Sequence, residues 1–186
     1  MRIAGILNND VVDGDGICVS LWVQGCPHHC EGCHNPHTWD MNGGKEYSLD
    51  EVCSILYSKI SADNVQRNLS ILGGEPLSPH CFKDVLEIIR RVKFKFPNIK
   101  IYLWTGYTYE ELLSREDQHD IGELFKSLYM LIDGRYEQDK RNISLKLRGS
   151  SNQRIYMHPH NNYPTCYLKD VTDTIDPWAI DKSVKI

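Results

Sequence analysis

Residues 68–104 read NLSILGGEPLSPHCFKDVLEIIRRVKFKFPNIKIYLW, and this stretch decides the fold class. Two short apolar runs, 68–72 and 99–104, enclose a segment that opens with Ser78-Pro79, a typical helix start. The pattern predicts a strand, a helix and a second strand, which is the repeating unit of an α/β protein. The residues expected to form the buried stripe of the helix are Phe82, Val85, Leu86, Ile89 and Val92.

The same alternation continues on both sides of this unit. Residues 48–61 predict a helix whose Ser48 and Glu51 are spaced as a capping box, and a shorter helix is predicted from Thr108. Apolar strands separated by amphipathic helices predict a parallel sheet with both faces covered. A complete eight-stranded barrel takes about 250 residues, so we expect an incomplete (β/α) barrel with an open side. Further strands are predicted at residues 17–24 and 128–132, with weaker ones at 143–147 and 154–158.

The composition places the chain among single-domain soluble proteins. Its 186 residues carry a net charge of −4 with basic residues scattered along the chain, which indicates neither a nucleic-acid partner nor a membrane surface. The first residues predict neither a signal peptide nor a membrane span. We expect a domain over residues 1–158 and a C-terminal extension of unknown role over residues 159–186.

The chain has seven cysteines, an odd number that argues against a disulfide framework and for a reducing, cytoplasmic location. Cys26, Cys30 and Cys33 crowd into one loop, and the other four, which lie far apart, are expected to be buried small hydrophobic residues. Cysteines separated by three and then two residues can direct three thiolates at one centre. With a four-iron cluster this leaves one iron open to an external molecule.

A structural zinc site of the Cys3His type fits the same residues. Four histidines lie within the loop or next to it, and spacing alone does not decide between zinc and iron–sulfur. The histidines concerned are His28, His29, His34 and His37.

Four segments follow predicted strands: the cysteine loop and residues 73–76, 105–107 and 133–134. Because ligands of α/β proteins gather at the carboxyl ends of the strands, we expect all four segments at one rim.

Taken together, these motifs resemble the radical S-adenosylmethionine superfamily and, within it, the family that activates anaerobic ribonucleoside-triphosphate reductases. Each motif is weak alone, but they run in family order over about residues 1–157. The matching segments are 13–16 (DGDG), 23–26 (VQGC), 33–40 (CHNPHTWD), 72–77 (LGGEPL), 104–108 (WTGYT), 132–136 (IDGRY) and 148–154 (RGSSNQR).

The resemblance implies a radical S-adenosylmethionine type of partial barrel and one 4Fe-4S cluster held by Cys26, Cys30 and Cys33. It also implies an activity: reduction of S-adenosylmethionine, followed by abstraction of hydrogen from a glycine of the reductase to leave a glycyl radical. The implied partners are the reductase, as protein substrate, and an electron donor such as reduced flavodoxin.

The resemblance also implies cofactor contacts. Gly73, Gly74 and Glu75 would receive the ammonium group, although a Gly-Gly pair after a strand is also a plain turn. Thr105 and Asp133 would bind the ribose or a cation near the cofactor carboxylate, or serve as helix caps. Many members of the superfamily carry an aromatic residue before the third cysteine, where this chain has Gly32. His34, with Asn35 beside it, is then the candidate for the adenine contact.

Three other functions remain open at this stage. The chain is similar to the activators of pyruvate formate-lyase around residues 33–40, although residues 148–154 favour the reductase. A radical enzyme that acts on a small molecule, as the deazaguanine-forming enzymes do, would need no protein partner. A zinc-stabilised binding module would have no catalytic activity.

Overall fold

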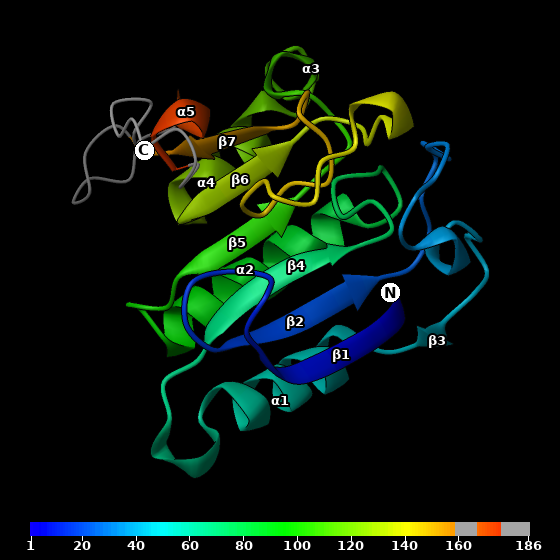
Figure 1. The fold of residues 1–186 in the computed structure, drawn as a ribbon. Coiled ribbons are helices and arrows are strands. Elements are labelled where there is room, and N and C mark those ends of the chain that lie inside the picture. Colours follow the sequence, from blue (N-terminus) through cyan, green and yellow to red (C-terminus); the bar gives the residue numbers. More distant parts are fainter. Residues whose placement is uncertain (159–166, 176–186) are drawn as a thin grey trace.

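The structure is a computed structural model that describes residues 1–158 and 167–175 (Figure 1). These residues form one eight-stranded sheet in the order β3-β1-β2-β4-β5-β6-β7-β8, and its two edge strands are not paired with each other. The sheet is therefore open, as expected. The strands are β1 (Arg2–Asp10), β2 (Cys18–Val23), β3 (Lys45–Glu46), β4 (Asn68–Gly73), β5 (Ile101–Trp104), β6 (Met130–Asp133), β7 (Arg154–Met157) and β8 (Lys169–Asp170).

Helices cover one face of the sheet. The helices are α1 (Leu49–Ile60), α2 (Phe82–Lys95), α3 (Tyr109–Leu113), α4 (Gln118–Ser127) and α5 (Thr172–Ile175), and the three long ones, α1, α2 and α4, lie against the same face (Figure 1). The main core lies between these three helices and the sheet, where strand side chains such as Leu21, Leu69, Ile71 and Leu131 are fully buried.

Loops, rather than helices, cover the opposite face. The hydroxyl of Ser70 donates to the backbone carbonyl of Asp13, and the amide of Asn68 donates to that of Asp15 at 2.9 Å. These contacts hold the loop between β1 and β2 across the face (Figure 1). Both faces of the sheet are therefore covered, one by helices and the other by loops.

Only the four central strands are parallel: β2, β4, β5 and β6. The strands outside them, β1, β3, β7 and β8, pair antiparallel with their neighbours, so the expectation of a wholly parallel sheet is wrong at both edges. A short loop joins β1 to β2, and a parallel pairing would require a crossover connection of a dozen or more residues.

The local sequence signals of α1 and α3 are confirmed. Ser48 and Glu51 form a complete capping box at the start of α1, and Thr108 and Glu111 form another at the start of α3. In contrast, α2 begins at Phe82 and not at Ser78-Pro79. Residues 76–81 form turns, in which the carbonyl of Ser78 accepts the N–H groups of Cys81 and Phe82.

Residues 143–147 form a turn and not the expected strand, and Ile143 is 83% exposed. Residues 154–158 do contain a strand, β7. In the second predicted segment, 159–186, residues 167–175 contribute β8 and α5, which extend the sheet next to β7. The domain boundary at residue 158 stays a prediction. None of the helices in the described residues is long and apolar enough to cross a membrane.

A carboxyl pair in the loop between β1 and β2 predicts pH-dependent stability. Burial and the neighbouring Asp10 raise the pKa of Asp13 from 3.8 to about 7. The folded chain therefore binds this proton more tightly than the unfolded chain, so stability is highest at low pH and falls as the pH rises through about 7. We expect a loss of roughly 1 to 2 kcal/mol between pH 5 and 8, reduced by partial exposure of the carboxyl.

In the variant Asp13→Asn the side-chain amide can still donate to Asp10 but cannot ionise. Urea unfolding of the metal-free chain should then show the variant equal to wild type only below about pH 4, and more stable than wild type by a larger margin at pH 8 than at pH 5. If both proteins lose the same stability between these pH values, Asp13 is not the group responsible.

Candidate functional site

The loops that follow β2, β4, β5 and β6 meet at one edge of the sheet, as the sequence predicts (Figure 1). The N–H of Gly74 donates to the carbonyl of Val23 at 2.8 Å, and the N–H of Glu75 donates to that of Gly25 at 2.8 Å. On the other side, the N–H of Gly134 donates to the carbonyl of Tyr107 at 3.2 Å. Backbone hydrogen bonds thus join neighbouring strand ends into one rim.

The cysteine loop leaves β2 and closes on itself. The N–H of Gly25 donates to the carbonyl of Thr38 at 2.8 Å, and the N–H of Cys26 donates to that of Trp39 at 3.2 Å. The side-chain amide of Gln24 adds a bond to the carbonyl of Asp40 at 2.8 Å. The three thiols therefore lie on a loop whose base is held by backbone and side-chain hydrogen bonds.

Backbone N–H groups face the sulfurs of all three candidate metal ligands. His28 and His29 donate to Cys26, Tyr136 donates to Cys30, and Asn35 donates to Cys33 over 3.3 Å. Such bonds stabilise a charged thiolate. Cys81 differs, since its thiol points at the carbonyl of Gln24, 3.6 Å away. The backbone around the three loop cysteines therefore favours their thiolate forms, which is what a metal ligand requires.

In the absence of a cation, the thiols of Cys26 and Cys30 hold their protons more tightly than an ordinary cysteine does. Burial raises the pKa of Cys26 to about 11, more than the two N–H groups lower it. Burial also raises the pKa of Cys30, against the lowering effect of the Tyr136 N–H and the Arg135 guanidinium. Because a metal must displace these protons, loading of the site releases protons and is favoured by higher pH.

The spacing of the three loop sulfurs bears on the zinc alternative. Among residues 1–158 and 167–175, one group of three His, Cys, Asp or Glu side chains has all its ligand atoms within 4.8 Å of one another. That group does not consist of Cys26, Cys30 and Cys33, so these three sulfurs are not all so close together. Tetrahedral zinc with Zn–S bonds of about 2.3 Å would hold the sulfurs roughly 3.8 Å apart. The three loop sulfurs are therefore spread more widely than the ligands of one zinc ion.

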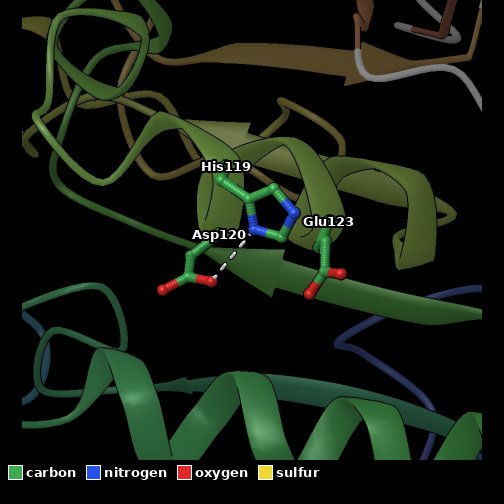
Figure 2. A group of neighbouring side chains, drawn as sticks. All are labelled: His119, Asp120 and Glu123. Atoms are coloured by element: carbon green, nitrogen blue, oxygen red, sulfur yellow. Dashed lines mark ion pairs between the residues drawn. The ribbon is translucent and has the colours of Figure 1, made fainter.

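The trio that does lie so close is His119, Asp120 and Glu123 on α4 (Figure 2). The side chain of His119 is 84% exposed, and Arg90 already forms ion pairs with Asp120 and Glu123. Exposed side chains neutralised by an arginine are a solvated helix surface, and they do not make a metal site.

Glu75 is fully buried at the centre of the rim. Its Oε1 accepts from the hydroxyl of Thr105 at 2.7 Å and from the N–H of Leu77 at 2.9 Å. Its Oε2 accepts from the N–H of Gly106 at 2.6 Å and lies 2.9 Å from Nε2 of His28. A carboxylate offers about four acceptor positions, so those of Glu75 are all engaged by the protein itself.

Gly73 and Gly74 allow the turn after β4 to pack directly on the start of the cysteine loop. A Cβ at Gly74 would overlap the carbonyl oxygen of Gly25. The two glycines therefore set how closely the turn approaches the base of the loop.

Thr105 and Asp133 lie at the same rim, and both are engaged by the protein. The hydroxyl of Thr105 also accepts from the N–H of Tyr107 at 3.1 Å. Asp133 accepts from the N–H of Tyr109 at 2.6 Å and pairs with Arg154 at 2.6 Å. Burial raises the pKa of Asp133, although Arg154 opposes this shift.

His34 is exposed and Asn35 is half-buried next to Cys33. The carbonyl of Asn35 accepts from the hydroxyl of Thr38 at 2.7 Å, which shapes the turn after the third cysteine. The side chain of Gln138, from the connection between β6 and β7, occupies the space beside Gly32. An aromatic residue before Cys33 would compete with Gln138 for this space.

Of the remaining cysteines, Cys18, Cys53 and Cys81 are buried, which confirms the prediction for them. Cys166 lies outside the described residues. One residue of the rim was not anticipated as part of it: His28, which sequence reasoning treated only as a possible zinc ligand. His28 and Glu75 are 47 residues apart in the sequence. A local sequence pattern cannot predict a contact between residues so far apart.

Known proteins are similar to this chain over most of its length. Residues 12–156 match a family described as a 4Fe-4S single cluster domain. The anaerobic ribonucleoside-triphosphate reductase-activating protein of Vibrio cholerae is 37% identical over 147 residues, which cover 79% of this chain and 92% of the relative. The protein of that name from Escherichia coli K12 is 33% identical over 147 residues, with 79% and 92% covered.

The relative of the same name from bacteriophage T4 is 37% identical over 147 residues, which cover 79% of this chain and 88% of the relative. The residues that the family model matches, 12–156, include all four segments of the rim. The chain belongs to the family of anaerobic ribonucleoside-triphosphate reductase-activating proteins.

Proposed function

We propose that this chain is an iron–sulfur activase that cleaves S-adenosylmethionine reductively and generates a glycyl radical on an anaerobic ribonucleotide reductase. The observation that carries the proposal is the arrangement of the rim. Three thiols, each faced by backbone N–H groups, lie on a loop that is hydrogen-bonded to the Gly-Gly-Glu turn of the next parallel strand. The family described as a 4Fe-4S single cluster domain supports the nature of the metal group.

In this proposal Cys26, Cys30 and Cys33 hold the cluster. When bound, the cluster supplies an open iron that chelates the amino acid part of the cofactor and an electron that breaks a bond of its sulfonium. Gly73 and Gly74 accept the cofactor ammonium with backbone carbonyls. Because the acceptor positions of Glu75 are engaged, its contribution is its negative charge and its support of the turn.

The remaining candidate contacts follow from position on the rim. We assign the adenine to His34 and Asn35, and the ribose, or a cation near the cofactor carboxylate, to Thr105 and Asp133. We also propose that the sheet is a partial barrel of the radical S-adenosylmethionine type. An open sheet with loops on its second face is consistent with such a barrel. Water has to be kept away from the reacting atoms. Because the sheet is open on one side, we propose that the bound protein substrate excludes water there.

The same proposal includes an external electron donor such as reduced flavodoxin and a reducing, cytoplasmic setting. Six cysteines of the described residues are free thiols, which is compatible with such a setting. Activation of pyruvate formate-lyase is the nearest rival, and the names of the relatives favour the reductase. A small-molecule substrate has no support among these relatives.

The test is anaerobic reconstitution with iron and sulfide, followed by addition of S-adenosylmethionine, a low-potential reductant and the reductase. We expect 5′-deoxyadenosine together with a glycyl radical signal in electron paramagnetic resonance (EPR). Cleavage of the cofactor without a radical on the reductase would contradict the choice of partner. The same assay with pyruvate formate-lyase in place of the reductase then tests the rival.

A further inference from the structure

His28 lies between two of the three loop cysteines in sequence, but its side chain turns away into the rim. The imidazole is only 7% exposed. Its Nε2 lies 2.9 Å from Oε2 of Glu75, and its Nδ1 accepts from Nε of Arg135 at 3.3 Å. Because a guanidinium can only donate, Nδ1 is the acceptor and Nε2 carries the proton that is donated to Glu75.

The rim provides a fitted slot for this imidazole. A Cβ at Gly106 would overlap the ring of His28, so a glycine at that position is required for the ring to lie there. The ring of Tyr107 meets the imidazole edge to face, with 4.6 Å between the centroids. One side chain of the cysteine loop thus contacts the segments that follow β4, β5 and β6.

Glu75 connects this slot to the turn after β4. Its Oε1 accepts hydrogen bonds from the N–H of Leu77 and the hydroxyl of Thr105. Its Oε2 accepts hydrogen bonds from His28 and the N–H of Gly106. The two oxygens belong to one rigid carboxylate. A shift of the cysteine loop relative to the Gly73-Gly74 turn therefore has to break the bond between His28 and Glu75.

We propose that His28 is a positioning residue that fixes the cysteine loop relative to the Gly73-Gly74 turn, so that a cofactor chelated at the cluster also reaches the backbone of the turn. This inference rests on the proposed function and deepens it. How well a ligand binds to both the cysteine loop and the turn depends on the distance between them. A misplacement of about 1 Å can lower a rate on the order of a hundredfold.

The test compares His28→Ala, His28→Gln and the exposed control His80→Ala as reconstituted full-length proteins. We expect His28→Ala to bind as much iron and sulfide as wild type, because the three thiols remain. Its KM for S-adenosylmethionine should rise about tenfold to a hundredfold, the effect of losing one charge-assisted hydrogen bond. In His28→Gln the amide can still donate to Glu75 and accept from Arg135, so most of the affinity should return.

A second readout does not depend on turnover. Binding of the cofactor to the open iron changes the EPR spectrum of the reduced cluster, and His28→Ala should need correspondingly more cofactor for the same change. His80→Ala should match wild type in both measurements.

A wild-type KM and spectral response in His28→Ala would overturn the positioning role, as would a His28→Gln variant as impaired as His28→Ala. Loss of iron from both variants would also overturn it, since His28 would then hold the cluster itself. If wild type fails to respond to the cofactor, the proposed function fails instead.

Discussion

Replacing Glu75 by glutamine is expected to destabilise the folded chain by about 3 to 5 kcal/mol. The carboxylate accepts four hydrogen bonds in a fully buried position. The NH2 end of a glutamine would face two of these donors, either Leu77 and Thr105 or Gly106 and His28, and leave them without an acceptor. Such a loss is a large part of the total stability of a domain of this size, about 5 to 15 kcal/mol.

Urea unfolding of the metal-free chain measures this effect. The matched control is Glu123→Gln, because the partially exposed Glu123 pairs with an arginine at the surface and its replacement should cost less than about 1 kcal/mol. If Glu75→Gln is destabilised no more than Glu123→Gln, the carboxylate does not hold the strand ends together in the way described.

Removing one thiol of the loop is expected to have the largest effect on activity. Each of Cys26→Ala, Cys30→Ala and Cys33→Ala leaves two thiolates, which is too few to hold a four-iron cluster with a single open iron. We expect the iron content to fall to near zero and the cleavage of S-adenosylmethionine to fall by at least about a thousandfold.

Cys53→Ala is the matched control, because Cys53 is buried in α1 and packs in the main core. It should keep its iron and its activity. Cofactor cleavage within about tenfold of wild type in Cys33→Ala would show that this thiol is not a ligand. Measuring iron beside activity separates loss of the cluster from a mere loss of rate.

Elements with a strong local signal could be predicted from the sequence. The two capping boxes mark α1 and α3 correctly, because each depends on residues three positions apart. Strand β1 escaped prediction because its pairing with β2 is interrupted by two register shifts, between Ile3 and Gly5 and between Leu7 and Asp10. These interruptions remove the regular alternation of buried and exposed side chains that identifies a strand.

At two places the structure differs from the local sequence preference. Glu75 accepts the N–H of Leu77 and holds the following residues in turns, so α2 begins at Phe82 although Ser78-Pro79 is a good helix start. Residues 143–147 alternate as a strand does, but Ile143 is exposed and the segment pairs with no strand in the described part of the chain.

The location of the site could be predicted because parallel strands bring their carboxyl ends to one edge. The partners of the individual side chains could not. Glu75 and Asp133 look like free carboxylates in the sequence, yet each is buried and bonded to residues from other strand ends. Only the folded chain shows that Glu75 joins the rim and that His28 links it to the cysteine loop.

The most direct test of the central claim is a count of iron, sulfide and zinc in the anaerobically purified protein. Three thiolates that leave one iron open predict about four irons and four sulfides per chain after reconstitution, and a brown protein. One tightly bound zinc per chain, with no sulfide and no uptake of iron, would contradict the account.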